Sequence, residues 1–116
     1  MKDLHSLYLS FETGIRSAKA VDPKRYLESI GLNYNELRIG FNSGQFHHRE
    51  EQSIKDHYES LGLLTKSDAG VNQEGLMAYK VFGRYGIIFP LFNEQNKVVN
   101  FFAIRFKMAS PKEEYL

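Results

Sequence analysis

The sequence predicts an α+β fold, with N-terminal helices followed by a small antiparallel sheet that includes a C-terminal hairpin. Apolar residues recur at helical spacing in three segments of residues 1–61, whereas residues 77–107 alternate or run apolar as strands do. Helices that precede strands, rather than alternate with them, are typical of α+β folds. A chain of 116 residues has the length of one domain, so we expect a single domain over residues 1–116.

Helices are predicted over residues 3–13, 23–30 and 49–61. Residues 15–21 either continue the first helix or form a connector, and the sequence leaves this open. Each predicted helix is followed by a glycine, the residue that most easily adopts the left-handed conformation that ends a helix. In the second helix, Asp22 is the expected N-cap and Pro23 occupies the first helical position, where a missing N–H costs nothing.

Four strands are predicted: residues 37–41, 77–82, 87–92 and 98–107. Pro90 has no N–H to donate to a neighbouring strand, which indicates a sheet edge or a bulge at that position. The residues between the last two strands, 93–97, have the composition of a hairpin turn, because asparagine tolerates the left-handed conformation. Residues 65–75 are polar with two glycines, and we interpret them as a surface loop.

The last predicted strand has two faces of different character. Strict alternation places these residues on one face: Val98, Asn100, Phe102, Ile104 and Phe106. We interpret that face as the core face. The other face begins apolar and ends with Arg105 and Lys107, a pattern that suits a sheet whose far end meets solvent or a ligand.

Positive charge is concentrated in residues 79–107, which carry five Lys or Arg against one Glu, although the whole chain has a net charge of only +1. A basic segment on a nearly neutral chain indicates an anionic partner. An ordinary solvated face explains the same charges, and charge alone does not decide between the two interpretations.

Aromatic and cationic side chains are interleaved in this segment. They are Tyr79, Lys80, Arg84, Tyr85, Phe101, Arg105 and Lys107. Cations neutralise phosphates and exposed aromatic rings stack on unpaired bases, so the segment predicts binding to nucleic acid. The alternative is that the aromatic residues belong to the core. This alternative is favoured for the phenylalanines and stays open for Tyr85, which lies between Arg84 and Gly86.

Residue types that carry catalysis are scarce. The chain has no cysteine, which excludes disulfides, a thiolate nucleophile and cysteine-bound zinc. The carboxylate pairs Glu50-Glu51 and Glu113-Glu114 are adjacent in sequence and point apart, so we interpret them as solvated surface rather than a magnesium site. The four histidines lack the His-x-x-x-His spacing of a helical zinc site. We expect no catalysis and no bound metal in this chain alone. An independent enzyme with a His/Glu metal site is the least favoured alternative.

The chain has no run of about 18 apolar residues, and its start is too polar for a secretory signal. Together with the absence of cysteine, these features predict a cytoplasmic protein without a membrane partner.

Several segments occur in a familiar order over nearly the whole chain: YLESIGLNYNELRIGF, LGLL, FGRYGIIFPLFNEQNKVVNFFAIRF and PKEEYL. This order resembles the catalytic core of bacterial-type DNA primases, in the N-terminal subdomain that precedes the TOPRIM domain. Divergent primase-like proteins of mobile elements are the nearest relatives that the resemblance suggests.

The resemblance implies a non-catalytic part of a DNA primase, a nucleotidyltransferase that makes the RNA primers of replication. In that family the subdomain helps to hold the single-stranded template and the primer. Arg84, Arg105 and Lys112 match basic positions that would contact nucleic-acid backbone or nucleotide phosphate, and Tyr115 matches a tyrosine of the last motif. With the neighbouring residues of the basic segment, the predicted nucleic-acid-binding residues are Lys80, Arg84, Tyr85, Arg105, Lys107, Lys112 and Tyr115.

The resemblance also implies partners and cofactors. The partners are single-stranded DNA, an RNA primer, the TOPRIM domain of the same parent chain and a helicase. We expect no cofactor in these 116 residues, because Mg²⁺ would be bound by the TOPRIM domain and zinc by a separate cysteine module. The chain stops inside the last family motif, which predicts that it is a piece of a larger protein.

The chain departs from the family pattern at basic positions. Ile30 and Gly86 replace family arginines, and Arg105 falls one residue late after the segment 100–103, which is rich in glycine in the family. The predicted groove is therefore less basic, and a second interpretation stays open. The chain would then be a structural or interaction module that braces the TOPRIM domain without contacting nucleic acid, with an exposed apolar patch near its C-terminus.

Overall fold

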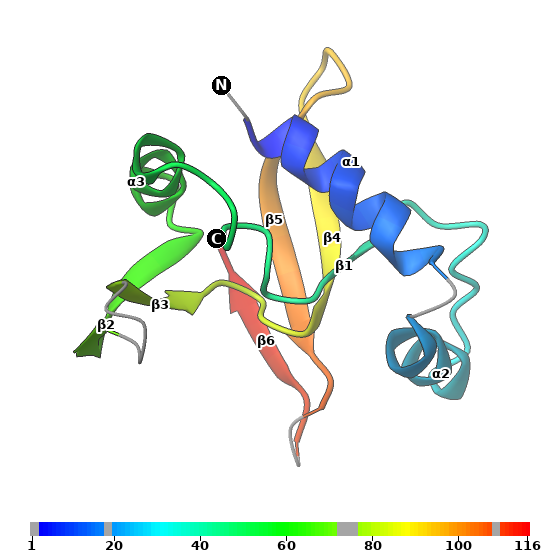
Figure 1. Cartoon of the computed structure of the whole chain (residues 1–116). Coiled ribbons are helices and arrows are strands. Elements are labelled where there is room, and N and C mark those ends of the chain that lie inside the picture. Colours follow the sequence, from blue (N-terminus) through cyan, green and yellow to red (C-terminus); the bar gives the residue numbers. More distant parts are fainter. Residues whose placement is uncertain (1–2, 18–19, 72–76, 108–109) are drawn as a thin grey trace.

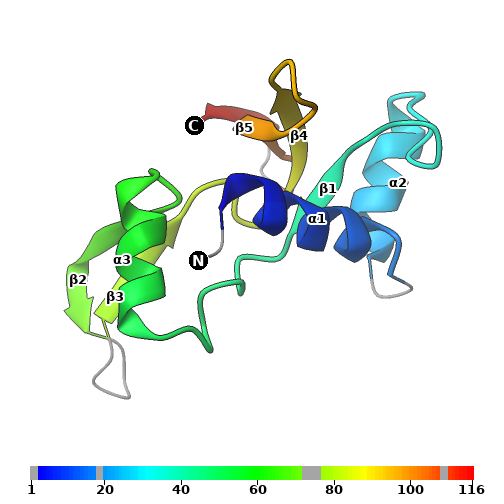
Figure 2. The same cartoon turned by 90° about the horizontal axis from the view of Figure 1, so that it is seen from above.

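The computed structural model describes residues 3–17, 20–71, 77–107 and 110–116, and it confirms the α+β class (Figure 1). An antiparallel sheet has the strand order β1-β4-β5-β6, and β2 pairs with β3 in a second, two-stranded sheet. The elements in chain order are α1 (Leu4–Ile15), α2 (Val21–Ser29), β1 (Gly40–Asn42), α3 (Gln52–Ser60), β2 (Leu64–Val71), β3 (Met77–Val81), β4 (Gly86–Phe92), β5 (Val98–Arg105) and β6 (Lys112–Tyr115). Helix α1 lies between α3 on one side and α2 on the other (Figure 2).

Helix α1 begins where the sequence predicts and ends later. The Asp3 carboxylate accepts the Ser6 N–H at 2.8 Å, as an N-cap does. The helix does not stop before Gly14 but continues to Ile15, whose side chain is fully buried and is part of the core. Burial of one more large apolar residue outweighs the cost of a glycine in the last turn.

Helix α2 begins two residues earlier than the sequence predicts, with Ala20 and not Asp22 at the N-cap position. Asp22 lies in the first turn, and its carboxylate bonds to the side chains of Tyr85 and Lys107 instead of the helix backbone. Side chains far away in the sequence therefore bind the Asp22 carboxylate, which the local sequence pattern assigns to a helix N-cap. Beyond the helix, Gly31 has the expected positive φ of 78°.

Two strands form where the sequence predicts none. Residues 65–75 are not simply a loop, because Leu64–Val71 pairs with β3; residues 72–76 lie outside the described residues. Near the C-terminus, Lys112–Tyr115 pairs with β5 and becomes an edge of the main sheet. Backbone hydrogen bonds to a preformed neighbour stabilise a strand whatever its side chains, so polar segments can join a sheet when a partner strand is adjacent.

From Asn100 onward the core face of β5 is the opposite of the one predicted, whereas Val98 is buried in the core as the sequence predicts. Phe101 and Ala103 are 1% and 0% exposed, whereas Phe102 is only half-buried. The pairing with β4 shows the cause: Val98 lies opposite Phe92 while Asn100 lies opposite Leu91, so β5 contains one extra residue between them. Such a β-bulge shifts the alternation by one and exchanges the two faces.

The hairpin between β4 and β5 confirms two expectations. Asn96 has a positive φ of 62°, as the turn composition predicts. Pro90 lies beyond the end of β1, whose pairing with β4 stops at Ile88, so in the part of the chain that the structure describes the proline has a neighbouring strand only on the β5 side.

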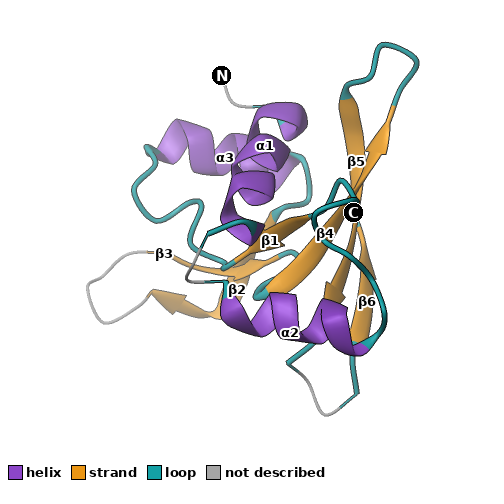
Figure 3. Ribbon diagram, turned by 90° about the vertical axis from the view of Figure 1, so that its right-hand side faces the viewer, coloured by secondary structure: helices purple, strands orange, loops and turns teal. Residues whose placement is uncertain are grey.

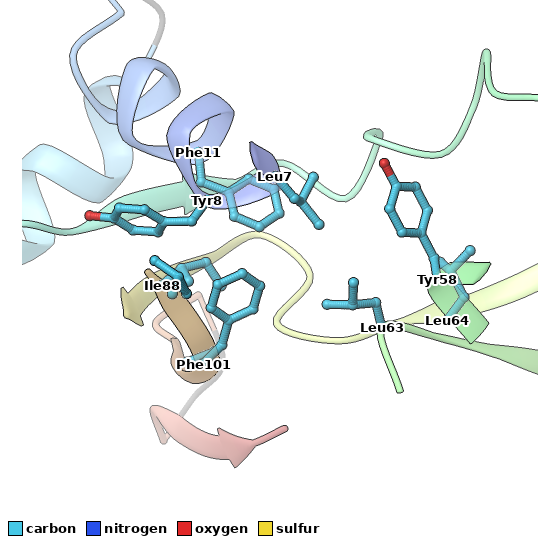
Figure 4. Close-up of a cluster of buried hydrophobic side chains, with 10 residues drawn as sticks. Leu7, Tyr8, Phe11, Tyr58, Leu63, Leu64, Ile88 and Phe101 are labelled. Carbon is cyan, nitrogen blue, oxygen red and sulfur yellow. The ribbon is translucent and has the colours of Figure 1, made fainter. Parts of the chain in front are cut away.

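The core has two parts on opposite faces of the main sheet. Ile88 points toward α1 and packs in a cluster with Phe101 and, on the side of α3, Leu63 (Figure 4). Helices α1 and α3 both lie on this side of the sheet (Figure 3). The neighbouring Ile87 points the other way and packs with Leu27 of α2. Each face of β4 therefore packs in a cluster of its own, and Ile15 at the end of α1 belongs to the cluster of Ile87 and Leu27.

Candidate nucleic-acid interface

A cleft of about 510 Å³ lies where the two-stranded sheet approaches the β5–β6 edge of the main sheet. The residues that line it are Gly62, Thr65, Tyr79, Lys80, Val81, Phe82, Arg84, Arg105 and Glu114. Three of these side chains are cationic and one is a carboxylate, so the cleft has a positive surplus. Three of the seven predicted binding residues, Lys80, Arg84 and Arg105, are brought together here.

Lys80 and Arg84 enter the cleft from β3 and from the turn that follows it. Lys80 is exposed and lies opposite Thr65 in the β2–β3 register. Arg84 is also exposed, and its stem passes over Gly44, where an added Cβ would come within 2.8 Å of the Arg84 Cγ. Because Gly44 has no side chain, the Arg84 stem can lie close to the backbone and its guanidinium can reach the cleft.

Arg105 and Glu114 form the floor of the cleft. The Arg105 Nη1 is 3.2 Å from Glu114 Oε1, with the two side chains 33% and 20% exposed. The second carboxylate oxygen, Oε2, accepts the Gly83 N–H at 2.8 Å. Glu114 thus connects β6 to β5 and to the turn between β3 and β4.

Tyr85 and Lys107 lie away from the cleft, beside α2. The Lys107 Nζ is 2.8 Å from Asp22 Oδ2, and the Tyr85 hydroxyl donates to the same oxygen at 2.9 Å. The Lys107 Nζ also lies 4.9 Å from the centre of the Tyr85 ring. Hydrogen bonds from Lys107 and Tyr85 lower the pKa of Asp22, and the bond to Asp22 raises the pKa of Lys107. The predicted face that ends with Arg105 and Lys107 together is therefore wrong, because the chain turns after Arg105.

Lys112 and Tyr115 are exposed on the edge strand β6. Lys112 lies opposite Arg105, so both belong to the same face of the sheet. Tyr115 belongs to the other face, where its ring centre is 5.0 Å from that of Phe102 and its hydroxyl donates to Glu113. Neither Lys112 nor Tyr115 lines the cleft, although Lys112 shares a face of the sheet with Arg105.

Glu114 was not identified from the sequence, which predicts a solvated surface pair with Glu113. The structure contradicts this for Glu114, because its side chain is only 20% exposed and is bonded on both oxygens. No local signal marks it, since only the β5–β6 register brings Glu114 opposite Ala103 and next to Gly83.

Within the described part of the chain, no three His, Asp or Glu side chains converge as metal ligands. His47 is 7% exposed, and burial, followed by the nearby positive groups, lowers its pKa to about 4. His57 is half-buried on the apolar side of α3. In the residues that the structure describes, no helix has the length and apolar character needed to cross a membrane.

The structure combines an α+β fold with a cleft lined by three cations and one carboxylate, a composition that suits an anionic ligand. Solved structures with this fold include a DnaG primase catalytic domain bound to single-stranded DNA, with a TM-score of 0.72 and 18% identity over 94% of this chain and 34% of that chain. The Escherichia coli primase catalytic core gives a TM-score of 0.76 at 19% identity, covering 97% of this chain and 36% of that chain. A further DnaG catalytic core gives 0.74 at 19% identity, over 94% and 34%.

At these identities the likeness shows a shared fold, and the chain spans about a third of each of those structures. Comparisons with protein-family models and with curated protein sequences find no match. The resemblance to primase catalytic cores is therefore confirmed for the fold.

Proposed function

We propose that the chain is a non-catalytic part of a DNA primase, its N-terminal core subdomain, and that the cleft helps to bind single-stranded template and primer. One observation carries this proposal: the cationic side chains Lys80, Arg84 and Arg105 line one cleft. Its support comes from the fold, which the chain shares with primase catalytic domains, one of them bound to single-stranded DNA.

The chemistry of the cleft suits a nucleic-acid strand. Each cation that neutralises a phosphate releases condensed counterions, which favours binding at low salt. Two half-buried aromatic residues, Tyr79 and Phe82, are among the residues that line the cleft. An aromatic ring beside cations can stack on an unpaired base while the cations contact the backbone. Lys112, on the same face as Arg105, would extend the phosphate track.

The remaining functions belong to the parent protein in this proposal. A TOPRIM domain would hold Mg²⁺ and carry out nucleotide transfer, a separate cysteine module would hold zinc, and a helicase would be a further partner. The described residues contain no group of carboxylates that would hold the Mg²⁺ themselves. The parent would make RNA primers for replication in the cytoplasm, and its mobile-element origin is part of the same proposal.

The test is binding of a labelled single-stranded oligonucleotide of about 12 nucleotides, measured by fluorescence anisotropy at about 50 mM and about 200 mM salt. The double variant Lys80→Gln/Arg84→Gln removes two exposed cations from the cleft. We expect it to bind roughly 30-fold more weakly and to lower the salt slope by about 1.4. The matched control, Arg25→Gln/Lys97→Gln, removes the same charge from exposed residues that do not line the cleft.

Equal losses in the two double variants would show a non-specific charge effect and contradict a binding cleft. Absence of binding at the lower salt concentration would favour the second candidate, a module that braces the TOPRIM domain.

One observation supports that second candidate. On the face opposite α1, the rings of Phe89 and Phe102 lie 5.4 Å apart, and Tyr115 continues the row at 5.0 Å from Phe102. Tyr115 is 73% exposed and Leu91, on the same face, is 51% exposed. An apolar row of this kind near the C-terminus suits contact with another domain. Tyr115→Ser in the parent protein would then increase proteolysis between the two domains without changing oligonucleotide binding.

A further inference from the structure

The Glu114 carboxylate lies among the cations of the cleft and is bonded as a bound anion would be. One oxygen contacts the Arg105 guanidinium at 3.2 Å, and the other accepts the Gly83 N–H at 2.8 Å. A guanidinium and a free backbone N–H are the donors that proteins commonly present to phosphate oxygens. The two donors come from different elements, β5 and the β3–β4 turn, and converge on a single acidic group.

Small residues make this arrangement possible. Gly83 is buried with a φ of +60°, and a Cβ there would lie 3.0 Å from both Ala103 Cβ and Ile88 Cδ1. Glu114 lies opposite Ala103 in the β5–β6 register, so only a methyl group occupies the sheet beside the carboxylate. Gly83 itself does not line the cleft, but its N–H is reached at 2.8 Å by the carboxylate of Glu114, which does.

We propose that, in the free chain, Glu114 occupies a phosphate-binding subsite formed by Arg105 and the Gly83 N–H, and that a phosphodiester of the bound strand displaces it. This inference rests on the proposed function, since it names the atoms that would hold one phosphate. The displaced carboxylate would turn toward solvent from β6, which is an edge strand and pairs with β5 alone among the described strands.

Displacement of the Glu114 carboxylate by a nucleic-acid strand is energetically more favourable than its displacement by a small anion. A partly exposed ion pair such as Arg105–Glu114 contributes little to stability, so breaking it costs little. A single small anion that displaces Glu114 only exchanges one negative group beside Arg105 for another. A strand gains the additional contacts with Lys80 and Arg84, which line the same cleft. Glu114 therefore lowers the affinity for small anions in particular and makes binding depend on several phosphates.

The chain offers a matched pair of variants. Glu114→Gln removes the charge that opposes Arg105 but keeps an oxygen that can accept the Gly83 N–H. Glu113→Gln removes the same charge one residue away, from an exposed side chain on the other face of β6. Unchanged thermal unfolding of both variants would show that β6 still pairs.

With a labelled single-stranded oligonucleotide at low salt, we expect Glu114→Gln to bind roughly tenfold more tightly than the unmodified chain. For Glu113→Gln we expect a gain of less than about twofold, because exposed charges at a distance are screened. If the unmodified chain binds with the expected salt dependence but Glu114→Gln binds no better than Glu113→Gln, the inference is wrong. Glu114 then orients Arg105, and the proposed function stands.

If neither the unmodified chain nor the variants bind the oligonucleotide, a second measurement separates the phosphate subsite from the proposed function. The amide resonance of Gly83 would be followed by NMR while inorganic pyrophosphate is added to each variant. A shift at lower pyrophosphate concentration in Glu114→Gln than in Glu113→Gln would support the subsite although the proposed function had failed. If the Gly83 resonance shifts at the same pyrophosphate concentration in the two variants, or shifts in neither, the subsite is contradicted as well.

Discussion

Arg105 and Lys107 are two residues apart in the sequence. Each forms an ion pair with a different carboxylate, and the surroundings of the two pairs differ. Arg105 shares a cleft with Lys80 and Arg84, so among the described lining residues one carboxylate, Glu114, faces three cations. Lys107 shares Asp22 with the Tyr85 hydroxyl, outside the set of residues that line the cleft. The count of positive charges along the sequence therefore does not show which cations can receive a ligand. That depends on how many acidic partners the fold places beside each of them.

The largest effect that we expect concerns the backbone that builds the cleft. Gly83→Ala forces a side chain into a left-handed backbone and within 3.0 Å of Ala103 and Ile88. We expect the free energy of unfolding to fall by roughly 2 to 4 kcal/mol, measured by denaturant titration.

Gly31→Ala is the control for Gly83→Ala. Gly31 has a φ of +78°, and an added Cβ there would meet no atom within 4 Å. The free energy of unfolding of Gly31→Ala should fall by only about 1 kcal/mol, the cost of the backbone conformation alone. Equal losses at the two glycines would mean that the turn beside the cleft is loosely packed.

The second expected effect is a dependence of stability on pH that differs between the two regions. His47, near Arg84 and the cleft, has its pKa lowered to about 4 in the folded chain from an ordinary value of 6.5, mainly by burial. Between these values the unfolded chain binds more protons, so stability rises with pH. We expect roughly 1 to 3 kcal/mol to be lost as the pH falls from about 6.5 to about 4.

Asp22, beside Lys107, has a lowered pKa, so its contribution is present above about 3.8, the ordinary aspartate value, and disappears only as the pH falls below it. Urea titrations at several pH values would separate the two windows. His47→Phe should remove the loss between pH 6.5 and 4, whereas His48→Gln, at an exposed position, should leave it in place. If stability is still lost between pH 6.5 and 4 in His47→Phe, the loss belongs to another titrating group.

The third expected effect compares single cations directly. Arg84→Ala should weaken oligonucleotide binding about tenfold, the value of one charge-assisted contact with a phosphate. Lys107→Ala removes the same charge, but we expect a change of less than about twofold, because Asp22 already compensates Lys107. Anisotropy titrations at one salt concentration would measure both. Equal losses would extend the interface from the cleft to the face beside α2.

The smallest expected effect is the loss of one hydroxyl. Tyr85→Phe removes the hydrogen bond to Asp22 but keeps the ring packed on Phe41, at 5.0 Å between ring centres. We expect a decrease in the free energy of unfolding of about 1 kcal/mol or less, and no change in oligonucleotide binding. Weaker oligonucleotide binding by Tyr85→Phe would place Tyr85 in the interface after all. Tyr115→Phe, which loses an exposed bond to Glu113, should show no measurable change in thermal unfolding.

Much of the candidate site could be predicted, and the remainder depends on pairing between distant segments. Lys80, Arg84 and Arg105 were identified from the interleaving of charge and aromatic residues, and the structure brings them to one cleft. Lys107 was grouped with Arg105 because alternation along a strand assumes that the strand continues. The strand ends at Arg105, and Asp22 of a different element attracts Lys107.

The sequence by itself determined the α+β class, the start of the first helix, the left-handed positions at Gly31 and Asn96, and the basic character of residues 79–107. These features depend on interactions within a few residues. Only the tertiary structure decided which face of β5 is buried, since one bulge opposite Leu91 reverses it. It also decided that two polar segments become β2 and β6 and that Glu114 meets Gly83. Those outcomes depend on backbone hydrogen bonds between segments far apart in the chain, which local preference does not encode.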